Sequence, residues 1–315
     1  MLLAMTSRIY ISDIHVSSAD AVRPARGRPY AWLTEGGSLR LAEFLRSDTV
    51  RAADQLFIVG DFVDMWSCPV DVEPPTFSQI LAAPHNVPIV DAIKKLRASG
   101  KGVFYLAGNH DMEVEDAEAQ HILGTTPLRT VFREKTLLVE HGHERCLFNA
   151  RDPRKDFRPF GYFITRIAAT AVARNHSPLH MDLWTILGNP DKVWALITGG
   201  TSLGKAVFDV CVAKTGVSLD EAILMPGGKR ISVGDVREMY AELYSIWDKS
   251  GRNSAREAVA CEWDPFYGLP FGHERLSIAG HSHERVFSYR KSDERLYMNL
   301  GSWCTNEADY GRSWS

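Results

Sequence analysis

The sequence predicts an α/β protein whose core of alternating strands and helices is interrupted by a long helical insertion. Short apolar runs alternate with amphipathic helical patterns over residues 1–149, and strand-like runs return over 276–315. The intervening residues 150–275 have an almost wholly helical pattern. We therefore expect two domains: a core formed by 1–149 together with 276–315, and a helical cap formed by 150–275.

The core strands are predicted from short apolar runs that end in polar residues or glycine. Helical patterns at 38–47 and 89–99 lie between the early strands, and Pro88 and Gly100 flank the second pattern as start and stop signals. The predicted strands are 8–12, 55–59, 102–107, 136–140, 276–280, 285–290 and 296–300.

Several signals mark helices within the insertion. Residues Phe160–Ala173 are nearly apolar on every side, so we expect a buried cap helix rather than one that contacts lipid. Asn189-Pro190 and the capping-box spacing Ser218-x-x-Glu221 each predict a helix start. Residues Ser232–Ser250 follow one amphipathic helical pattern, which Gly251 ends.

Composition excludes several classes of protein. Hydrophobic residues make up 45% and charged residues 24% of the 315-residue chain, which excludes a disordered or fibrous protein. The formal net charge of −3 argues against a basic nucleic-acid binder, so we expect no nucleic-acid partner. The five cysteines form no CxxC pair, which argues against a disulfide framework and favours a reducing, cytoplasmic location.

The sequence gives no sign of membrane attachment. The amino-terminal residues lack the apolar segment of a secretory signal, and no apolar run reaches the roughly 18 residues of a membrane span. We therefore expect neither a transmembrane segment nor peripheral membrane contact. The oligomeric state is left open.

Polar side chains that suit metal binding follow five of the predicted strands. On an extended backbone, residues two apart share a face, as Asp13 and His15 would. Ligand sites in open α/β sheets lie beyond the carboxyl ends of the strands, so we expect these side chains to meet at one edge. The five segments are Asp13-Ile14-His15, Gly60-Asp61-Phe62-Val63-Asp64, Gly108-Asn109-His110-Asp111, His141-Gly142-His143 and Gly280-His281-Ser282-His283.

These segments predict a site for two metal ions. A single histidine or aspartate of this kind is usually a structural or turn residue, but an ordered set, each after an apolar run, favours a metal site. Mixed imidazole, carboxylate and amide ligands indicate manganese, iron or zinc. The candidates exceed the needs of one tetrahedral zinc and suit two ions about 3.5–4 Å apart that share a carboxylate. They are Asp13, His15, Asp61, Asn109, His141, His281 and His283.

The ordered segments resemble those of the calcineurin-like metallophosphoesterase family. Residues Asn299-Leu300-Gly301-Ser302-Trp303 are also similar to the family's last-strand segment. The resemblance covers the core and leaves out the insertion. It implies a four-layer αββα fold, in which two mixed β-sheets pack face to face as a sandwich with helices outside.

The resemblance also implies a role for each site residue. Two divalent metal ions, manganese first with iron or zinc as alternatives, would share Asp61 and activate a hydroxide that attacks phosphorus. His110 would stabilise the transition state or protonate the leaving group, and Asp64 or Asp111 would orient it or a metal-binding histidine. One ion would be bound by Asp13, His15, Asp61 and His283, and the other by Asp61, Asn109, His141 and His281.

Features near the insertion bear on the substrate. The run Gly60–Trp66 is similar to that of UDP-2,3-diacylglucosamine hydrolases, which also carry a helical insertion after the His-Gly segment. Those enzymes commonly have arginine at the position of His110, and this departure favours a general phosphomonoesterase or phosphodiesterase. Arginine pairs with phosphate in many proteins, although a solvated loop is the alternative here. The predicted substrate contacts are His143, Arg151, Arg154 and Arg158.

The sequence thus predicts a metal-dependent phosphohydrolase that cleaves a phosphomonoester or phosphodiester of a small phosphorylated substrate. One alternative keeps the chemistry but makes the substrate a nucleotide-linked lipid diphosphate. The other is a non-catalytic metal-binding scaffold. The presence of every ligand and of His110 counts against that scaffold.

Overall fold

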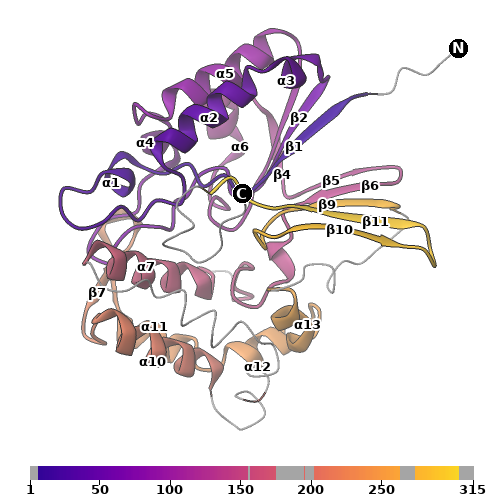
Figure 1. Cartoon of the computed structure of the whole chain (residues 1–315). Coiled ribbons are helices and arrows are strands. Elements are labelled where there is room, and N and C mark those ends of the chain that lie inside the picture. Colours follow the sequence, from indigo (N-terminus) through magenta and orange to yellow (C-terminus); the bar gives the residue numbers. More distant parts are fainter. Residues whose placement is uncertain (1–5, 155–156, 175–194, 196–201, 263–273, 305–315) are drawn as a thin grey trace, which may run out of the picture.

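Two β-sheets form the centre of the core (Figure 1). The structure, a computed structural model, describes residues 6–154, 157–174, 195, 202–262 and 274–304. The first sheet contains β1 (Arg8–Ile11), β2 (Gln55–Val59), β3 (Gly102–Leu106) and β4 (Thr126–Arg129). The second contains β5 (Val131–Glu134), β6 (Leu137–Glu140), β9 (Leu276–Ala279), β10 (Arg285–Arg290) and β11 (Arg295–Leu300).

The predicted α/β core with two sheets is confirmed, and every predicted strand is found to within one residue at each end. The second sheet, ordered β10-β11-β9-β6-β5, is mixed as expected. The first sheet, ordered β1-β2-β3-β4, is parallel at every pairing. The sequence did not predict β4 and β5. Proline is unfavourable inside a sheet, and Pro127 is tolerated because β4 lies at the sheet edge.

An apolar layer holds the two sheets face to face. Phe57 and Val59 of β2 form one buried cluster with Val139 of β6 and Ile278 of β9. The Phe57 ring also meets the Phe132 ring of β5 edge-on, with centroids 4.9 Å apart. The carboxyl ends of strands in the two sheets therefore lie beside one another. This packing brings together the polar segments that follow those strands.

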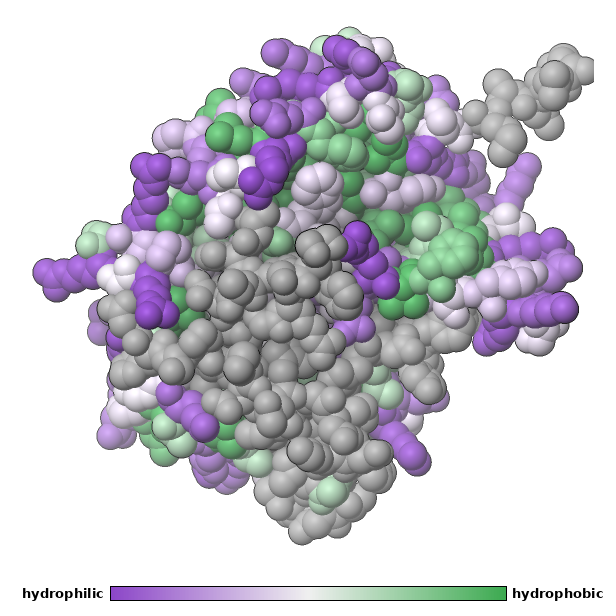
Figure 2. Space-filling view, viewed as in Figure 1, coloured by the Kyte–Doolittle hydropathy of each residue, from purple (hydrophilic) through white to green (hydrophobic). Residues whose placement is uncertain are grey.

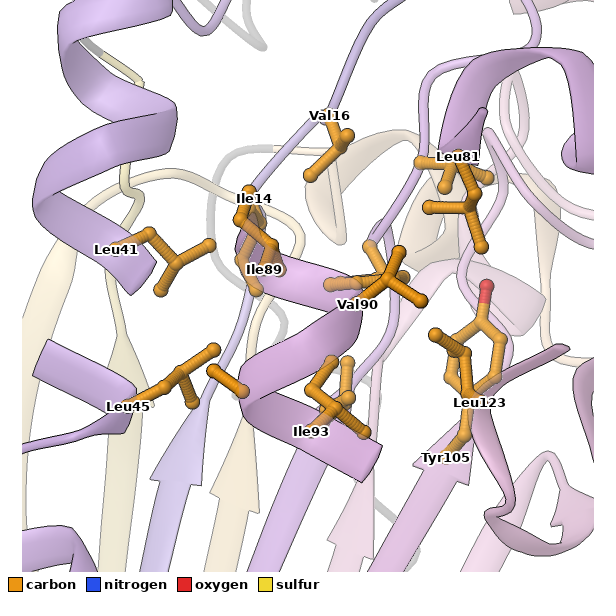
Figure 3. Packing of buried hydrophobic residues seen from close by; sticks show 14 of the residues in the cluster. Ile14, Val16, Leu41, Leu45, Leu81, Ile89, Val90, Ile93, Tyr105 and Leu123 are labelled. Atoms are coloured by element: carbon orange, nitrogen blue, oxygen red, sulfur yellow. The ribbon is translucent and has the colours of Figure 1, made fainter. Parts of the chain in front are cut away.

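Helices cover the outer face of the first sheet (Figure 1). Leu41, Ile89 and Ile93 on two of these helices pack against Ile14 and Tyr105 of the sheet side (Figure 3). The predicted helices at 38–47 and 89–99 correspond to α2 (Glu35–Leu45) and α5 (Val87–Ala98). The helices of this part are α1 (Ala19–Val22), α2 (Glu35–Leu45), α3 (Asp48–Ala52), α4 (Phe77–Leu81), α5 (Val87–Ala98) and α6 (Asp116–Leu123).

Phe160, Phe208, Tyr240 and Trp247 of the insertion belong to one apolar cluster, which also includes Trp66 of the core. The insertion is helical as predicted but also contains a hairpin, formed by β7 (Ala222–Leu224) and β8 (Arg230–Ser232). Among its described residues, the helices are α7 (Phe160–Ala173), α10 (Leu203–Thr215), α11 (Val233–Met239), α12 (Leu243–Asp248) and α13 (Ala255–Ala260). Short 3₁₀ turns are η1 (His143–Arg145) and η2 (Pro226–Gly228).

The predicted single helix over Ser232–Ser250 is wrong, because the chain breaks between α11 and α12. The carbonyl oxygen of Met239 accepts a hydrogen bond from Arg154 (3.0 Å), and that of Ala241 accepts one from Ser202. Donors from elsewhere in the chain thus occupy oxygens that a continuous helix would use.

Of the two other predicted helix starts, the one at Ser218 is wrong and the one at Asn189-Pro190 is not tested. Glu221 accepts a hydrogen bond from the backbone N–H of Ser218 (2.9 Å), as in a capping box, but the chain then enters β7 rather than a helix. Asn189-Pro190 lies outside the described residues. In contrast, the buried cap helix is confirmed, because α7 spans the predicted residues and buries Phe160, Tyr162 and Ile167.

The buried guanidinium of Arg166 ties α7 to the loop that follows β2. It donates hydrogen bonds to the carbonyl oxygens of Cys68 (2.7 Å), Pro69 (2.7 Å) and Val72 (2.6 Å). It also donates to the carbonyl oxygen of Leu224 in β7 (3.0 Å). One side chain therefore joins a cap helix, the cap hairpin and a core loop.

The surface of the outer helices is hydrophilic. Hydrophilic side chains predominate over α2, α3 and α5 in the space-filling view (Figure 2). Among the described residues, the helices are too short or too polar to cross a bilayer.

Candidate metal centre

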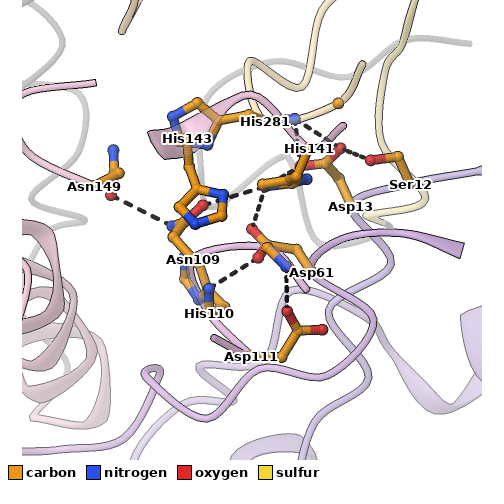
Figure 4. A network of polar contacts seen from close by, with 12 residues as sticks. Ser12, Asp13, Asp61, Asn109, His110, Asp111, His141, His143, Asn149 and His281 are labelled. Carbon is orange, nitrogen blue, oxygen red and sulfur yellow. Dashed lines mark hydrogen bonds and ion pairs between the residues drawn. The ribbon is translucent and has the colours of Figure 1, made fainter. Parts of the chain in front are cut away.

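The polar ends of five strands meet at one place, as the sequence predicted (Figure 4). Asp13 and His15 follow β1, and Asp61 follows β2. Asn109 follows β3, and His141 follows β6. The remaining pair, His281 and His283, follows β9. Six of the seven predicted ligand side chains are buried or nearly buried. The seventh, that of His283, is 28% exposed.

One half of the centre is formed by side chains after β1, β2 and β9. Nε2 of His15 lies 3.1 Å from Nε2 of His283 and 3.7 Å from Oδ2 of Asp61. Oδ1 of Asp13 lies 3.4 Å from the same nitrogen of His283. Two imidazoles and two carboxylates thus direct ligand atoms toward a common point.

The other half is centred on His141. Its Nε2 lies 3.2 Å from Oδ2 of Asp61 and 3.2 Å from Oδ1 of Asn109. Its Nδ1 lies 2.9 Å from the carbonyl oxygen of Val59, which fixes the ring and leaves Nε2 toward the centre. The ring of His281 meets that of His141 with centroids 5.3 Å apart. Asp61 therefore lies between the two halves.

The ligand segments have an uncommon backbone conformation. Among the described residues, seven non-glycine residues have a positive φ, and five of these are predicted ligands. Such conformations persist where the surroundings fix them, and they gather at functional sites. The five are Asp13 (50°), His15 (54°), Asp61 (49°), His281 (76°) and His283 (58°).

Backbone N–H groups hold the carboxylates in place. The N–H of His281 donates to both oxygens of Asp13 (3.0 Å each), and the N–H of His110 donates to Oδ1 of Asp61 (2.8 Å). Gly60 is required for the same packing: its φ is +79°, and a Cβ there would lie 2.3 Å from Nδ1 of His141. The orientation of each ligand is therefore set by the loops themselves.

Charges in the centre shift one another's protonation. Burial lowers the pKa of His15 to about 3. Burial alone would lower the pKa of His141 as well, but the carboxylates of Asp61 and Asp13 raise it to about 10. Burial would raise the pKa of Asp13, but His141 and His283 hold it at about 2. The carboxylates of the centre are therefore ionised at neutral pH, as metal ligands must be.

The donor set fits two divalent ions. Ligand atoms of Asp13, His15 and Asp61 lie within 4.8 Å of one another, and the described residues form further groups of this kind around the centre. The buried Nδ1 of His15 and Oδ2 of Asp64 have no hydrogen-bond partner within the described ranges. Imidazole, carboxylate and amide donors in this number suit a pair of first-row transition metal ions.

Comparison with known families agrees with this geometry. A family model described as calcineurin-like phosphoesterase matches residues 8–285, which include the ligands of all five segments up to His283. The chain belongs to the calcineurin-like phosphoesterase family. Members of this family are typically hydrolases with a dimetal site, and the buried histidine and aspartate groups of this chain resemble such a site.

Individual relatives match parts of the chain. It is 31% identical over 142 residues to a UDP-2,3-diacylglucosamine hydrolase of Xanthomonas oryzae pv. oryzae, and 32% identical to one of Xanthomonas axonopodis pv. citri. Each match covers 44% of this chain, and the chain spans about half the length of the relative (47%). A solved structure of a dimetal phosphatase from Danio rerio aligns with a TM-score of 0.35 and 10% identity, over 95% of this chain and 88% of that chain.

In this calcineurin-like phosphoesterase, Asp64 rather than Asp111 holds the ring of His110. Oδ1 of Asp64 lies 2.8 Å from Nδ1 of His110, and the Trp66 ring stacks on the imidazole with centroids 4.5 Å apart. Asp111 instead accepts hydrogen bonds from the backbone N–H groups of Phe62 (2.8 Å) and Gly108 (2.6 Å). Asp111 therefore joins the loops that carry the ligands.

The predicted substrate contacts differ in their surroundings. His143 is buried beside His141, with ring centroids 5.3 Å apart. Arg154 forms a two-pronged ion pair with Asp152, and Arg158 pairs with Glu113, so both serve contacts within the protein. The Arg151 side chain is 50% exposed and lies 3.4 Å from Glu144, which in turn lies 3.5 Å from His143.

Sequence reasoning missed side chains that surround the ligands. The Trp32 ring lies 5.4 Å from His15 and 5.3 Å from His283, measured between centroids. Asn149 and Glu262 lie behind Asn109 and His281. Nothing in the local pattern around Trp32 or Glu262 points to the centre. Trp66 is different, because it lies in the run after Gly60 that carries the family resemblance.

Proposed function

We propose that the protein is a metal-dependent phosphohydrolase that cleaves a phosphomonoester or phosphodiester of a small molecule. The observation that carries this proposal is the convergence of buried aspartate, histidine and asparagine ligand atoms around Asp61. One ion would be held by Asp13, His15, Asp61 and His283, and the other by Asp61, Asn109, His141 and His281. When bound, the two ions would polarise the phosphoryl oxygens and lower the pKa of a water molecule.

His110 would supply the proton for the leaving oxygen. With Nδ1 held by Asp64, its Nε2 is the ring nitrogen available to the substrate. Burial would lower the pKa of His110, but Asp64 and Asp61 raise it above the ordinary value. This shift favours the protonated ring that a general acid requires.

We propose Mn²⁺ as the metal, with iron or zinc as alternatives. Carboxylate and amide oxygens suit Mn²⁺, and imidazole also suits zinc and iron. The mixed donors of Asp61, Asn109 and His141 support an ion of intermediate character.

Hydrolysis by metal-stripped protein tests the proposal. We would assay bis-p-nitrophenyl phosphate and p-nitrophenyl phosphate with Mn²⁺, Zn²⁺, Fe²⁺ or Mg²⁺ added back, beside the Asp61→Ala variant. We expect metal-dependent turnover in the wild type. The variant should lose metal and activity together, because Asp61 lies between both halves of the centre.

The outcomes separate the readings. The preferred substrate would distinguish a diesterase from a monoesterase. Near-wild-type turnover by the Asp61→Ala variant would contradict the two-metal assignment. Metal binding without turnover of either compound would favour the non-catalytic scaffold or a more selective enzyme.

A second candidate is hydrolysis of UDP-2,3-diacylglucosamine, and the similarity to the two Xanthomonas enzymes of that name supports it. Against it, the subfamily that the Gly60–Trp66 run resembles commonly has arginine at the position of His110. Consumption of UDP-2,3-diacylglucosamine, with the Asp61→Ala variant as control, tests this candidate. We also propose a cytoplasmic location, which the burial of the five cysteines without any disulfide between them supports and which cell fractionation tests.

A further inference from the structure

A buried carboxylate of the insertion lies directly behind the metal centre. Glu262 follows α13, and the residue is 8% exposed. Its Oε1 accepts a hydrogen bond from the backbone N–H of Phe148 (2.6 Å), and its Oε2 accepts one from Nδ2 of Asn149 (2.7 Å). Oε2 also lies 3.8 Å from Nε2 of His281. The Glu262 carboxylate therefore lies beside the predicted ligand His281. It is also hydrogen-bonded to Asn149, the neighbour of a second predicted ligand of the same ion.

Asn149 extends this contact to Asn109 (Figure 4). Oδ1 of Asn149 accepts a hydrogen bond from Nδ2 of Asn109 at 3.4 Å. Oδ1 of Asn109 then lies 3.2 Å from Nε2 of His141. The side-chain amides of Asn149 and Asn109 are thus oriented alike. Each has its NH₂ group on the side of Glu262 and its oxygen on the side of the metal centre.

The chemistry of Glu262 fixes that direction. An ionised carboxylate only accepts hydrogen bonds, so the amide of Asn149 must turn its NH₂ group toward Glu262. Its oxygen then faces Asn109, which must turn its own NH₂ group toward Asn149. The oxygen of Asn109 is left toward the centre, and the oxygen of an amide, not its NH₂ group, is a metal ligand.

Close packing restricts Asn149 to this place. Gly161, in the first turn of α7, lies so near that a Cβ there would be 2.5 Å from Oδ1 of Asn149. Asn149 lies just before the insertion and Glu262 lies near its end. Contacts from both ends of the insertion therefore meet at Asn149, which is hydrogen-bonded to Asn109.

We propose that Glu262 is a positioning residue that acts through Asn149 to hold the Asn109 oxygen toward the ion that Asn109, His141 and His281 would bind. This inference rests on the proposed function. It assigns the insertion a part in metal binding in addition to its position over the core.

Titration of the metal-free protein with Mn²⁺, followed by electron paramagnetic resonance, tests the proposal on the Glu262→Gln variant. Glutamine has one acceptor for two donors, so it either reverses the amides or leaves a buried donor without an acceptor. We expect affinity for one of the two Mn²⁺ ions to fall about 10–100-fold, while affinity for the other is unchanged.

Two further variants separate positioning from loosening of α13. Glu257→Ala removes the capping box at the start of the same helix, where Glu257 accepts from the N–H (2.9 Å) and hydroxyl (2.9 Å) of Ser254. We expect both Mn²⁺ affinities to stay at wild-type values in that variant. Asn149→Leu should weaken the same site as Glu262→Gln, and the double variant should lose little more than either alone, because both act through one contact chain.

Unchanged Mn²⁺ affinity in Glu262→Gln would overturn the proposal, as would equal weakening of both sites in Glu262→Gln and Glu257→Ala. Failure of the wild type to bind two Mn²⁺ ions would instead overturn the proposed function itself. The wild-type titration and hydrolysis assay therefore distinguish the two failures.

Discussion

His110 is held on two sides, which distinguishes it from the histidines that face one another across the centre. Asp64 contacts its Nδ1 at 2.8 Å, and the Trp66 ring stacks on its imidazole. Trp66 in turn meets Tyr162 of α7 edge-on, with centroids 5.8 Å apart. The ring that would deliver a proton is therefore positioned by a core carboxylate and, through Trp66, by the cap.

Replacing His110 tests its role as an acid. We expect His110→Ala to keep both Mn²⁺ ions, because the ligand contacts around Asp61 involve the backbone N–H of residue 110 and not its ring. The turnover number should fall roughly 10²–10⁴-fold, the usual contribution of a general acid. Metal analysis and kcat are the measurements. Loss of one Mn²⁺ ion would show instead that His110 is a ligand.

Replacing Asp64 tests what raises the pKa of His110. The Asp64→Asn variant keeps an oxygen that can accept from Nδ1 but removes the negative charge. Since that charge raises the pKa of His110, its removal lowers the pKa, and the acid loses its proton at lower pH. We expect the alkaline limb of kcat against pH to move to lower pH than in the wild type. An unmoved limb would mean that another group sets it.

At the scale of single elements, α7 links the insertion to the core. Its Arg166 is fully buried and donates hydrogen bonds to carbonyl oxygens of the loop after β2 and of β7. Asp64 and Trp66 lie in that same loop, just before Cys68. The helix therefore fixes the path of the chain on which the partners of His110 lie.

The Arg166→Met variant should be strongly destabilised. Methionine fills similar space but leaves several buried carbonyl oxygens without donors, so we expect a loss of about 3 kcal/mol or more in the free energy of unfolding. Urea denaturation measures this loss. The control is Arg174→Met after the end of the same helix, where the pair with Glu221 is partly exposed and should be worth under about 1 kcal/mol. Equal losses in both variants would contradict this account.

The elements that the sequence predicted well are those with a local signal. The strands carry apolar runs, and α5 has Pro88 and Gly100 at its ends. The break between α11 and α12 was not predictable, because Arg154 and Ser202, which bind the carbonyl oxygens there, come from distant parts of the chain. The capping-box spacing at Ser218 is local too, yet the following residues pair as β7 with β8.

The same distinction applies to the site. Each ligand lies in a short segment after a strand, so a motif could locate it. The motif could not decide between Asp64 and Asp111 as the partner of His110, because that depends on how two loops pack. Glu262 had no local signal at all, since its contact with Asn149 joins residues 113 positions apart.

For the whole molecule, the metal centre lies where the two sheets and the insertion meet. Asp13 and His15 come from the first sheet, and His141 and His281 come from the second. Glu262 of the insertion contacts the centre's surroundings through its hydrogen bond with Asn149. Ions bound there would join segments from the beginning and the end of the chain, so metal binding should stabilise the whole fold.

Thermal unfolding with and without metal tests this coupling. An ion at 100 times its dissociation constant adds about 2.7 kcal/mol to the free energy of unfolding, so two ions add about 5 kcal/mol. At roughly 2 °C per kcal/mol for a large domain, we expect Mn²⁺ to raise the midpoint by about 10 °C relative to protein in EDTA. The Asp61→Ala variant should show a much smaller rise, because Asp61 lies between both halves of the centre. Equal midpoints for the wild type in Mn²⁺ and EDTA would mean that the centre does not hold these segments together through metal.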